Sequence, residues 1–172
     1  MYEIILCGRG GQGIVFLTRL IGDIATERGL GVISSETHGM AVRGGSINSH
    51  LRIGPFYSPL IREGRADVLV SLDPAETANN VHFLKPGGVT VENSPGPDDS
   101  AVRRIDASRL AREIGRVQLE NVVVLGFAST LAGFPVSSEE IAARLSKDPR
   151  ETVRAMNLKA LELGAAFGSG RA

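Results

Sequence analysis

The segment Glu36-Thr37-His38-Gly39-Met40-Ala41-Val42-Arg43-Gly44-Gly45 combines a carboxylate, an imidazole and a guanidinium within ten residues. Three glycines accompany these side chains, and the segment shows neither helical nor strand periodicity. Glycine adopts positive φ angles and lets a backbone approach a ligand or another chain closely. The pattern therefore predicts a loop that contacts a ligand or a protein partner.

The side chains of this loop allow several roles. His38 lies two positions from a carboxylate and can titrate near neutral pH, so catalysis, contact with a partner and a structural hydrogen bond all stay open. Arg43 precedes two glycines, and a guanidinium binds phosphate or carboxylate through paired hydrogen bonds. The residues predicted to contact a ligand or a partner are Glu36, His38, Gly39, Met40, Gly44 and Gly45.

A second glycine-rich motif follows the first apolar run of the chain. The glycines of Gly8-Arg9-Gly10-Gly11-Gln12-Gly13 stand between an expected strand and an expected helix, where the N–H groups of the helix favour an anion. Arg9 adds a positive charge. A tight turn that binds nothing is the alternative. The residues predicted to bind a cofactor are Gly8, Arg9, Gly10, Gly11, Gln12 and Gly13, together with Arg43.

This second motif also allows a dinucleotide-binding enzyme of the Rossmann type. Such an enzyme needs an acidic residue at the end of the second strand to hold the ribose, and Glu36 stands near that position. The glycine-rich loop and the further strand expected after Glu36 are not typical of that fold. No serine or cysteine has a recognisable activating neighbour, so we predict no catalytic residue in this chain.

Composition limits the classes of function. The 172 residues suit a single domain, and nineteen basic residues balance nineteen acidic ones, so we expect no binding to nucleic acid or to a membrane surface. One cysteine and three histidines are too few for an expected metal site.

Cys7 is expected to be a buried, inert thiol, with a reactive thiol as the alternative. No secretory leader is evident, so we expect a cytoplasmic protein.

Hydrophobic patterning predicts alternating strands and helices, followed by a helical tail. The architecture is expected to be a three-layer α/β/α sandwich with a mostly parallel, mixed sheet and a helical C-terminal part, all within residues 1–172. Strands are expected at residues 2–7, 31–35, 46–53, 66–72, 89–92 and 102–105. Helices are expected at residues 14–28, 74–84, 107–115, 119–132, 138–146 and 149–167.

Several local predictions accompany this pattern. The strand at residues 46–53 is expected to be antiparallel or at a sheet edge, with His50 and Arg52 exposed. Ser138 is expected to cap its helix. The apolar stripe of the last helix is expected to pack on the sheet, with a partner subunit as the alternative. Residues 57–61 are expected to form an interface or to fold over the core.

The sequence resembles the gamma subunit or domain of 2-oxoacid:ferredoxin oxidoreductases of the pyruvate, ketoisovalerate and indolepyruvate types, and most of all the small subunit of the indolepyruvate type. The two glycine-containing segments carry this resemblance, together with three further ones. These are Ser49-His50-Leu51-Arg52-Ile53-Gly54, Tyr57-Ser58-Pro59-Leu60-Ile61 and Ala66-Asp67-Val68-Leu69. Relatives often have Glu-Pro where this chain has Asp73-Pro74, which leaves any contact that needs the longer side chain in doubt.

The resemblance implies a subunit of an enzyme that oxidatively decarboxylates a 2-oxoacid, makes an acyl-coenzyme A and reduces ferredoxin. Thiamine diphosphate, magnesium and the 4Fe-4S clusters are expected in thiamine-binding and ferredoxin-like partner subunits. The present chain is expected to be inactive alone, to pack against those subunits and to contribute to the coenzyme A site. A free-standing dinucleotide-binding enzyme and an assembly module without a ligand are the alternatives.

Overall fold

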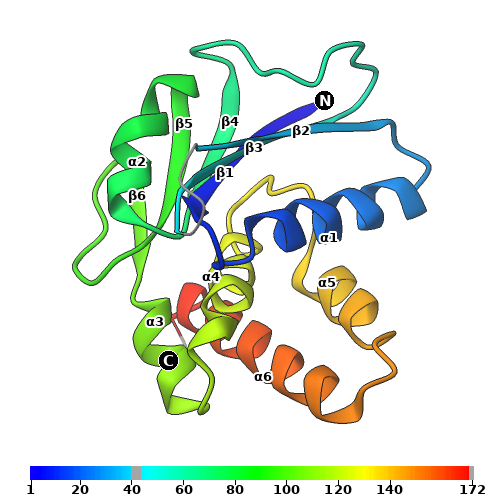
Figure 1. The fold of residues 1–172 in the computed structure, drawn as a ribbon, viewed down its shortest axis with the longest axis vertical. Coiled ribbons are helices and arrows are strands. Elements are labelled where there is room, and N and C mark those ends of the chain that lie inside the picture. Colours follow the sequence, from blue (N-terminus) through cyan, green and yellow to red (C-terminus); the bar gives the residue numbers. More distant parts are fainter. Residues whose placement is uncertain (40–43, 171–172) are drawn as a thin grey trace.

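The computed structural model describes residues 1–39 and 44–170. In these residues six strands form one sheet in the order β2-β3-β1-β4-β5-β6 (Figure 1). The strands are β1 (Tyr2–Arg9), β2 (Val32–His38), β3 (Ser46–Ile53), β4 (Ala66–Ser71), β5 (Leu84–Asn93) and β6 (Val102–Ile105). The α-helices are α1 (Ile14–Glu27), α2 (Pro74–Asn80), α3 (Ala107–Glu113), α4 (Glu120–Ala128), α5 (Ser138–Leu145) and α6 (Glu151–Gly168).

The sheet is mixed, as predicted. Strand β3 runs antiparallel to both of its neighbours, β1 and β2, whereas β1, β4, β5 and β6 are parallel to one another. A parallel connection needs a crossover segment, and the described residues between β2 and β3 form no helix. The prediction of an antiparallel strand at residues 46–53 is therefore confirmed. The edge position belongs to β2 rather than to β3.

Alternation along β1 divides the core between the two faces of the sheet. Ile4 and Leu6 belong to the large apolar core under α1 and α4, whereas Ile5 and Cys7 belong to a smaller apolar cluster on the opposite face. Helix α2 lies beside the sheet on that second face, and α5 and α6 add a further tier beyond α1 and α4 (Figure 1). The predicted layered α/β architecture with a helical C-terminal part is confirmed.

The predicted exposure of His50 is wrong. Its side chain is buried, its Nδ1 accepts a hydrogen bond from the backbone N–H of Ile61 at 3.1 Å, and its ring lies 4.9 Å from the ring of Phe83. Burial, followed by the charge of Arg52, lowers the pKa of His50. The alternation of apolar and polar residues along this strand predicted that the face with His50 is solvated. The alternation could not show that the segment after β3 folds back over that face.

Arg52, like His50, is less exposed than predicted. The guanidinium of Arg52 pairs with Glu3 at 2.8 Å and lies 3.9 Å from the centre of the Phe56 ring, so it is partly buried rather than exposed. Ile61 is buried in the smaller apolar cluster, while Tyr57 is fully exposed. Residues 57–61 therefore both cover the core and present an aromatic ring to solvent.

Two helices, α2 and α5, differ from prediction at one end each. Helix α2 ends at Asn80, because residues 81–83 form a 3-10 turn and Leu84 begins β5. The cap of α5 is Ser137 rather than Ser138, and its hydroxyl accepts a hydrogen bond from the N–H of Glu140 at 3.3 Å. The two residues share the same capping chemistry, so the sequence alone placed the helix start one residue late.

Helix α6 packs mainly on α4 rather than on the sheet (Figure 1). Gly164 of α6 lies against the backbone of α4, where an added Cβ would overlap the carbonyl oxygen of Val123. Gly126 of α4 faces the carbonyl oxygen of Leu161 in the same way. The paired glycines let the two helix backbones approach closely. Among the described residues no helix is long and apolar enough to cross a membrane.

Candidate ligand site at the carboxyl end of the first strand

The first glycine motif lies where β1 leaves the sheet. After β1 the chain enters α1 on one face of the sheet, and after the neighbouring β4 it enters α2 on the other face (Figure 1). Ligands of open α/β sheets bind at the carboxyl ends of two neighbouring strands whose connections leave in this way. The topology therefore places residues 9–13 at a favourable position for binding.

The structure brings the two predicted glycine motifs together. The N–H of Gly10 donates a hydrogen bond to the carbonyl oxygen of Gly45 at 2.8 Å, and the N–H of Gly39 donates to the carbonyl oxygen of Ser46 at 2.7 Å. The hydroxyl of Ser46 donates to Glu76 of α2 at 2.6 Å. The predicted contacts of Met40 and Arg43 lie outside the described residues and stay predictions.

Helix α1 begins without a side-chain cap. Its N-cap is Gly13, at φ 85°, and within the described part of the chain no side chain caps it and no acidic residue lies in its first turn. The positive φ angle favours glycine here, and a Cβ at Gly13 would also displace the side-chain amide of Asn121. The first N–H groups of a helix carry partial positive charge. This helix start therefore favours an anion.

The side chain of Gln12 shapes the glycine loop from inside. Its carbonyl oxygen accepts a hydrogen bond from the N–H of Arg9 at 2.7 Å. Its amide nitrogen donates to the carbonyl oxygen of Leu72 and to the carboxylate of Glu120, each at 3.1 Å. These bonds tie the loop to the ends of β4 and α4. These hydrogen bonds do not test whether Gln12 also contacts a cofactor, so that contact stays a prediction.

Glu120 is the centre of a buried polar network beneath the loop. Besides Gln12, it accepts hydrogen bonds from the hydroxyl of Ser108 at 2.7 Å and from the amide of Asn93 at 3.4 Å. Asn93 in turn accepts from the N–H groups of Ala107 and Ser108 at the start of α3. The ends of β5, α3 and α4 are thus joined under the glycine loop.

Arg9 supplies a cation at the rim of the site. Its Nε lies 2.7 Å from a carboxylate oxygen of Asp73, and about half of its side chain is exposed. The other carboxylate oxygen of Asp73 caps α2 by accepting from the N–H of Ala75 at 2.9 Å. Aspartate at this position therefore serves both the helix start and the guanidinium. Because about half of the Arg9 side chain is exposed, part of its guanidinium is available to an anion.

Glu36 and His38 lie on the edge strand β2. They are in register with Ser49 and Ile47 of β3, and His38 is exposed. Among the described residues no hydrogen bond joins the carboxylate to the imidazole, and none joins either side chain to the glycine loop. The three roles considered for His38 therefore remain predictions.

Cys7 has the predicted burial. Its side chain is inaccessible to solvent, and burial raises the pKa of the thiol to about 12. A thiol with this pKa stays protonated and unreactive at neutral pH. Among the residues that the structure describes, no three histidine, cysteine or acidic side chains are grouped so that they could hold a metal ion.

Sequence reasoning missed four polar residues of this site: Glu120, Asn121, Asn93 and Ser108. Glu120 and Asn121 begin a helix whose next residues are all buried. Two polar residues directly before such an apolar run were a signal for a buried polar network. Asn93 and Ser108 carried no comparable signal, because their partners are distant in sequence.

Comparison with known proteins places this arrangement in a family. The family model described as pyruvate ferredoxin/flavodoxin oxidoreductase matches residues 3–167. The chain is also 34% identical to the indolepyruvate oxidoreductase subunit IorB of Archaeoglobus fulgidus, over 94% of this chain and 92% of that one. The chain belongs to the pyruvate ferredoxin/flavodoxin oxidoreductase family. The resemblance inferred from the glycine motifs is confirmed.

Solved structures of this family share the fold. The gamma subunit of a keto/oxoacid ferredoxin oxidoreductase from Geobacter sulfurreducens superimposes with a TM-score of 0.80 at 26% identity, covering 99% of both chains. A 2-oxoglutarate:ferredoxin oxidoreductase from Magnetococcus marinus, solved with 2-oxoglutarate, coenzyme A and succinyl-CoA bound, gives a TM-score of 0.83 at 27% identity. The match covers 98% of this chain and 31% of that one. These comparisons support a subunit of the 2-oxoacid:ferredoxin oxidoreductase type.

Proposed function

We propose that this protein is the gamma-type subunit of an enzyme that oxidatively decarboxylates a 2-oxoacid to an acyl-coenzyme A and reduces ferredoxin. In this proposal the chain binds phosphate groups of coenzyme A at the glycine loop and packs against the thiamine-binding and ferredoxin-like subunits. Ferredoxin is then an indirect partner, reached through those subunits. The observation that carries the proposal is the uncapped start of α1 beside the half-exposed Arg9.

The physical argument rests on the charge of the ligand. Coenzyme A carries several phosphate charges, and the amino end of a helix together with a guanidinium favours such a group. The 14-residue helix α1 has no acidic residue in its first turn that would compete for this position. Gly10 and Gly11 are exposed and carry no side chain that would shield the backbone.

Electron transfer and decarboxylation belong to the partner subunits. A 4Fe-4S cluster requires several thiolates, and the only thiol here is buried and protonated. The single thiol supports placing the clusters in other subunits, and the proposal places thiamine diphosphate and magnesium there as well. The present chain alone is expected to carry out no step of the reaction.

Reconstitution tests this proposal. The chain is mixed with a thiamine-binding subunit of such an enzyme, and 2-oxoacid-dependent reduction of ferredoxin is measured in the presence of coenzyme A. Activity is expected only when both proteins are present. A stable complex without that activity, or ferredoxin reduction by this chain alone, would contradict the proposal.

The free-standing Rossmann-type enzyme is less well supported by the topology. In a Rossmann sheet the second strand lies next to the first, which brings its terminal acidic residue to the ribose. Here β3 separates β2 from β1, so Glu36 lies two strand spacings, about 10 Å, from the first strand. Tight binding of NAD by the isolated chain, lost in Glu36→Ala, would nevertheless favour that enzyme.

A further inference from the structure

Glu120, the first residue of α4, has a buried carboxylate whose partners are all neutral hydrogen-bond donors. Its Oε1 accepts from the amide nitrogen of Gln12 at 3.1 Å, and its Oε2 accepts from the hydroxyl of Ser108 at 2.7 Å and from the amide of Asn93 at 3.4 Å. The side chain is 9% exposed. Among the described residues no cation pairs with it. A buried carboxylate in this setting depends on its hydrogen bonds.

The bond from Gln12 is the only hydrogen bond that Oε1 of Glu120 accepts from the described residues. Movement of Gln12 out of the loop would leave this oxygen unpaired, and a buried acceptor that loses its partner costs more than the bond itself contributes. The rest of the Gln12 amide is held by the N–H of Arg9 and the carbonyl of Leu72. Because one partner donates and two accept, a single orientation of the amide satisfies all three.

Gly8 provides the space that the Gln12 side chain occupies. A Cβ at Gly8 would lie 2.8 Å from the side-chain carbonyl oxygen of Gln12 and 3.2 Å from the Cβ of Leu72. Gly8 is not one of the glycines with a positive φ angle, so the turn itself does not require glycine at this position. The first glycine of the motif therefore admits Gln12 beneath the loop.

The hydrogen bonds divide the N–H groups of the loop into two sets. Those of Arg9, Gly10 and Gln12 donate within the protein. Those of Gly11 and Gly13 donate to no described residue, and these two glycines have φ angles of 99° and 85°. Backbone N–H groups in turns of this kind form concave sites for anions. The bonds beneath the loop thus leave a second set of donors for a ligand.

We propose that Glu120 is a positioning residue of the coenzyme A site. By holding Gln12 beneath the loop, it keeps the N–H groups of Gly11 and Gly13 in place for a phosphate group, and it touches no ligand itself. The proposal rests on the function proposed above, which supplies coenzyme A as the ligand. It makes the affinity for coenzyme A dependent on a side chain at the start of a buried helix.

Two substitutions separate the hydrogen bond from the rest of the side chain. Glu120→Gln can still accept from Gln12 and donate to Ser108, so the KM for coenzyme A of the assembled enzyme should stay within about threefold of the wild type. Glu120→Met has a similar length but no oxygen, so this KM should rise about tenfold or more. The kcat and the KM for the 2-oxoacid should both change by less than about twofold.

Two further variants test whether Glu120 acts through Gln12. Gln12→Met should also raise the KM for coenzyme A by about tenfold, and the double variant with Glu120→Met should lose no more than either single variant. Glu120→Asp keeps a carboxylate for Ser108 and Asn93 but shortens the reach to Gln12. It should raise the same KM by about threefold to tenfold even where Glu120→Met fails to fold. Additive losses in the double variant would contradict the proposal.

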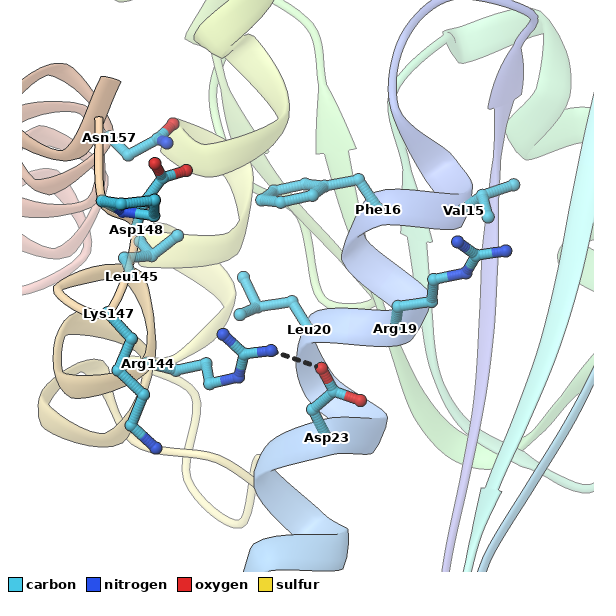
Figure 2. A pocket seen from close by; sticks show the side chains of 11 residues that line it. Val15, Phe16, Arg19, Leu20, Asp23, Arg144, Leu145, Lys147, Asp148 and Asn157 are labelled. Atoms are coloured by element: carbon cyan, nitrogen blue, oxygen red, sulfur yellow. Dashed lines mark hydrogen bonds and ion pairs between the residues drawn. The ribbon is translucent and has the colours of Figure 1, made fainter. Parts of the chain in front are cut away.

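Two contacts of α1 that do not reach the loop supply control variants. The buried hydroxyl of Thr18 donates to the hydroxyl of Ser49 at 2.8 Å. Farther along α1, Asp23 pairs with Arg144 of α5 at 2.7 Å across a groove (Figure 2). Thr18→Val should lower the free energy of unfolding in urea, and both Thr18→Val and Asp23→Asn should leave the KM for coenzyme A unchanged.

Hydrogen exchange at the Arg9 amide of the full chain separates this proposal from the proposed function. This amide donates to Gln12, so Glu120→Met should speed its exchange by about tenfold, whereas Thr18→Val should not. Unchanged exchange at Arg9 in Glu120→Met would overturn the positioning role alone. Faster exchange with a wild-type KM for coenzyme A would reject both that role and the placement of coenzyme A at the glycine loop.

Discussion

At the scale of single residues, the candidate site depends on groups that shape the glycine loop from beneath. Gln12 forms its three hydrogen bonds within the chain, and Glu120 receives one of them at a buried position. Arg9 and the backbone of α1 remain for a ligand. The loop is therefore pre-organised by side chains that stay inside the protein.

Gly13 gives the sharpest prediction at this scale. Gly13→Ala should reduce the free energy of unfolding mainly through its positive φ angle, which costs about 1–2 kcal/mol, and further because the side-chain amide of Asn121 would have to move. Gly115→Ala is a matched control, because Gly115 has φ 83° and nothing near its Cβ position. Urea unfolding measures both variants. Equal losses would show that Asn121 does not restrict this position.

His50 predicts a dependence of stability on pH. Because its pKa is lowered in the folded state, the unfolded chain binds a proton more readily as the pH falls below the ordinary value of 6.5. The free energy of unfolding should therefore fall as the pH drops below about 6.5, because the unfolded chain takes up a proton while the folded chain keeps His50 neutral, with its Nδ1 accepting the bond from Ile61. Urea unfolding of His50→Asn should show a weaker dependence over that range.

The exposed His38 is the control for this measurement. His38→Asn should keep the pH dependence of the wild type. If His50→Asn and the wild type depend on pH equally, His50 contributes nothing to acid sensitivity.

At the scale of elements, the tail of the chain is held by a helix crossing rather than by the sheet. Helix α6 approaches α4 at Gly164 and Gly126, where each backbone meets a carbonyl of the other helix. This crossing fixes α4, and α4 carries Glu120 and Asn121 at its start. Packing at the tail is thereby connected to the glycine loop.

Gly164→Ala should reveal this connection. Its Cβ would overlap the carbonyl oxygen of Val123, so the free energy of unfolding should fall by about 1–3 kcal/mol or more despite the better helix propensity of alanine. Gly22→Ala, in the interior of α1, meets only side-chain methyls, of Val32 at 3.3 Å and of Leu51 at 3.8 Å, and should lose much less. A thermal melt in which both variants match the wild type would show that α4 and α6 separate easily.

The element order was predictable because each strand and helix carries its own periodic pattern. An apolar run ending at glycine predicted β1, an apolar run before Asp73-Pro74 predicted β4, and the stripe from Ile14 to Ala25 predicted α1. The burial of His50 was not predictable, since it depends on a segment that folds back from residues 54–65. The packing of α6 on α4 depends on two distant glycines, which local patterning does not connect.

The candidate site was predictable to the same degree. The glycine motifs indicated both loops, and their proximity appears only in the bond between Gly10 and Gly45. The network around Glu120 joins residues far apart in sequence, from Gln12 to Ser108. Pairwise contacts of this kind require the fold, whereas the backbone chemistry of a glycine loop is visible in the residues themselves.

At the scale of the whole molecule, the proposed recognition surface of the chain is the glycine loop. This loop offers backbone N–H groups and Arg9. Overall charge is balanced, so recognition must come from these local features. In the proposed function, the chemistry of oxidation resides in the partner subunits.

Hydrogen exchange of the assembled enzyme, with and without coenzyme A, tests the central claim most directly. At about ten times the dissociation constant of coenzyme A, exchange of the amides in residues 9–16 should slow by about tenfold, while the exposed turn at residues 115–118 should be unaffected. Bound coenzyme A that leaves exchange in residues 9–16 unchanged would contradict the account.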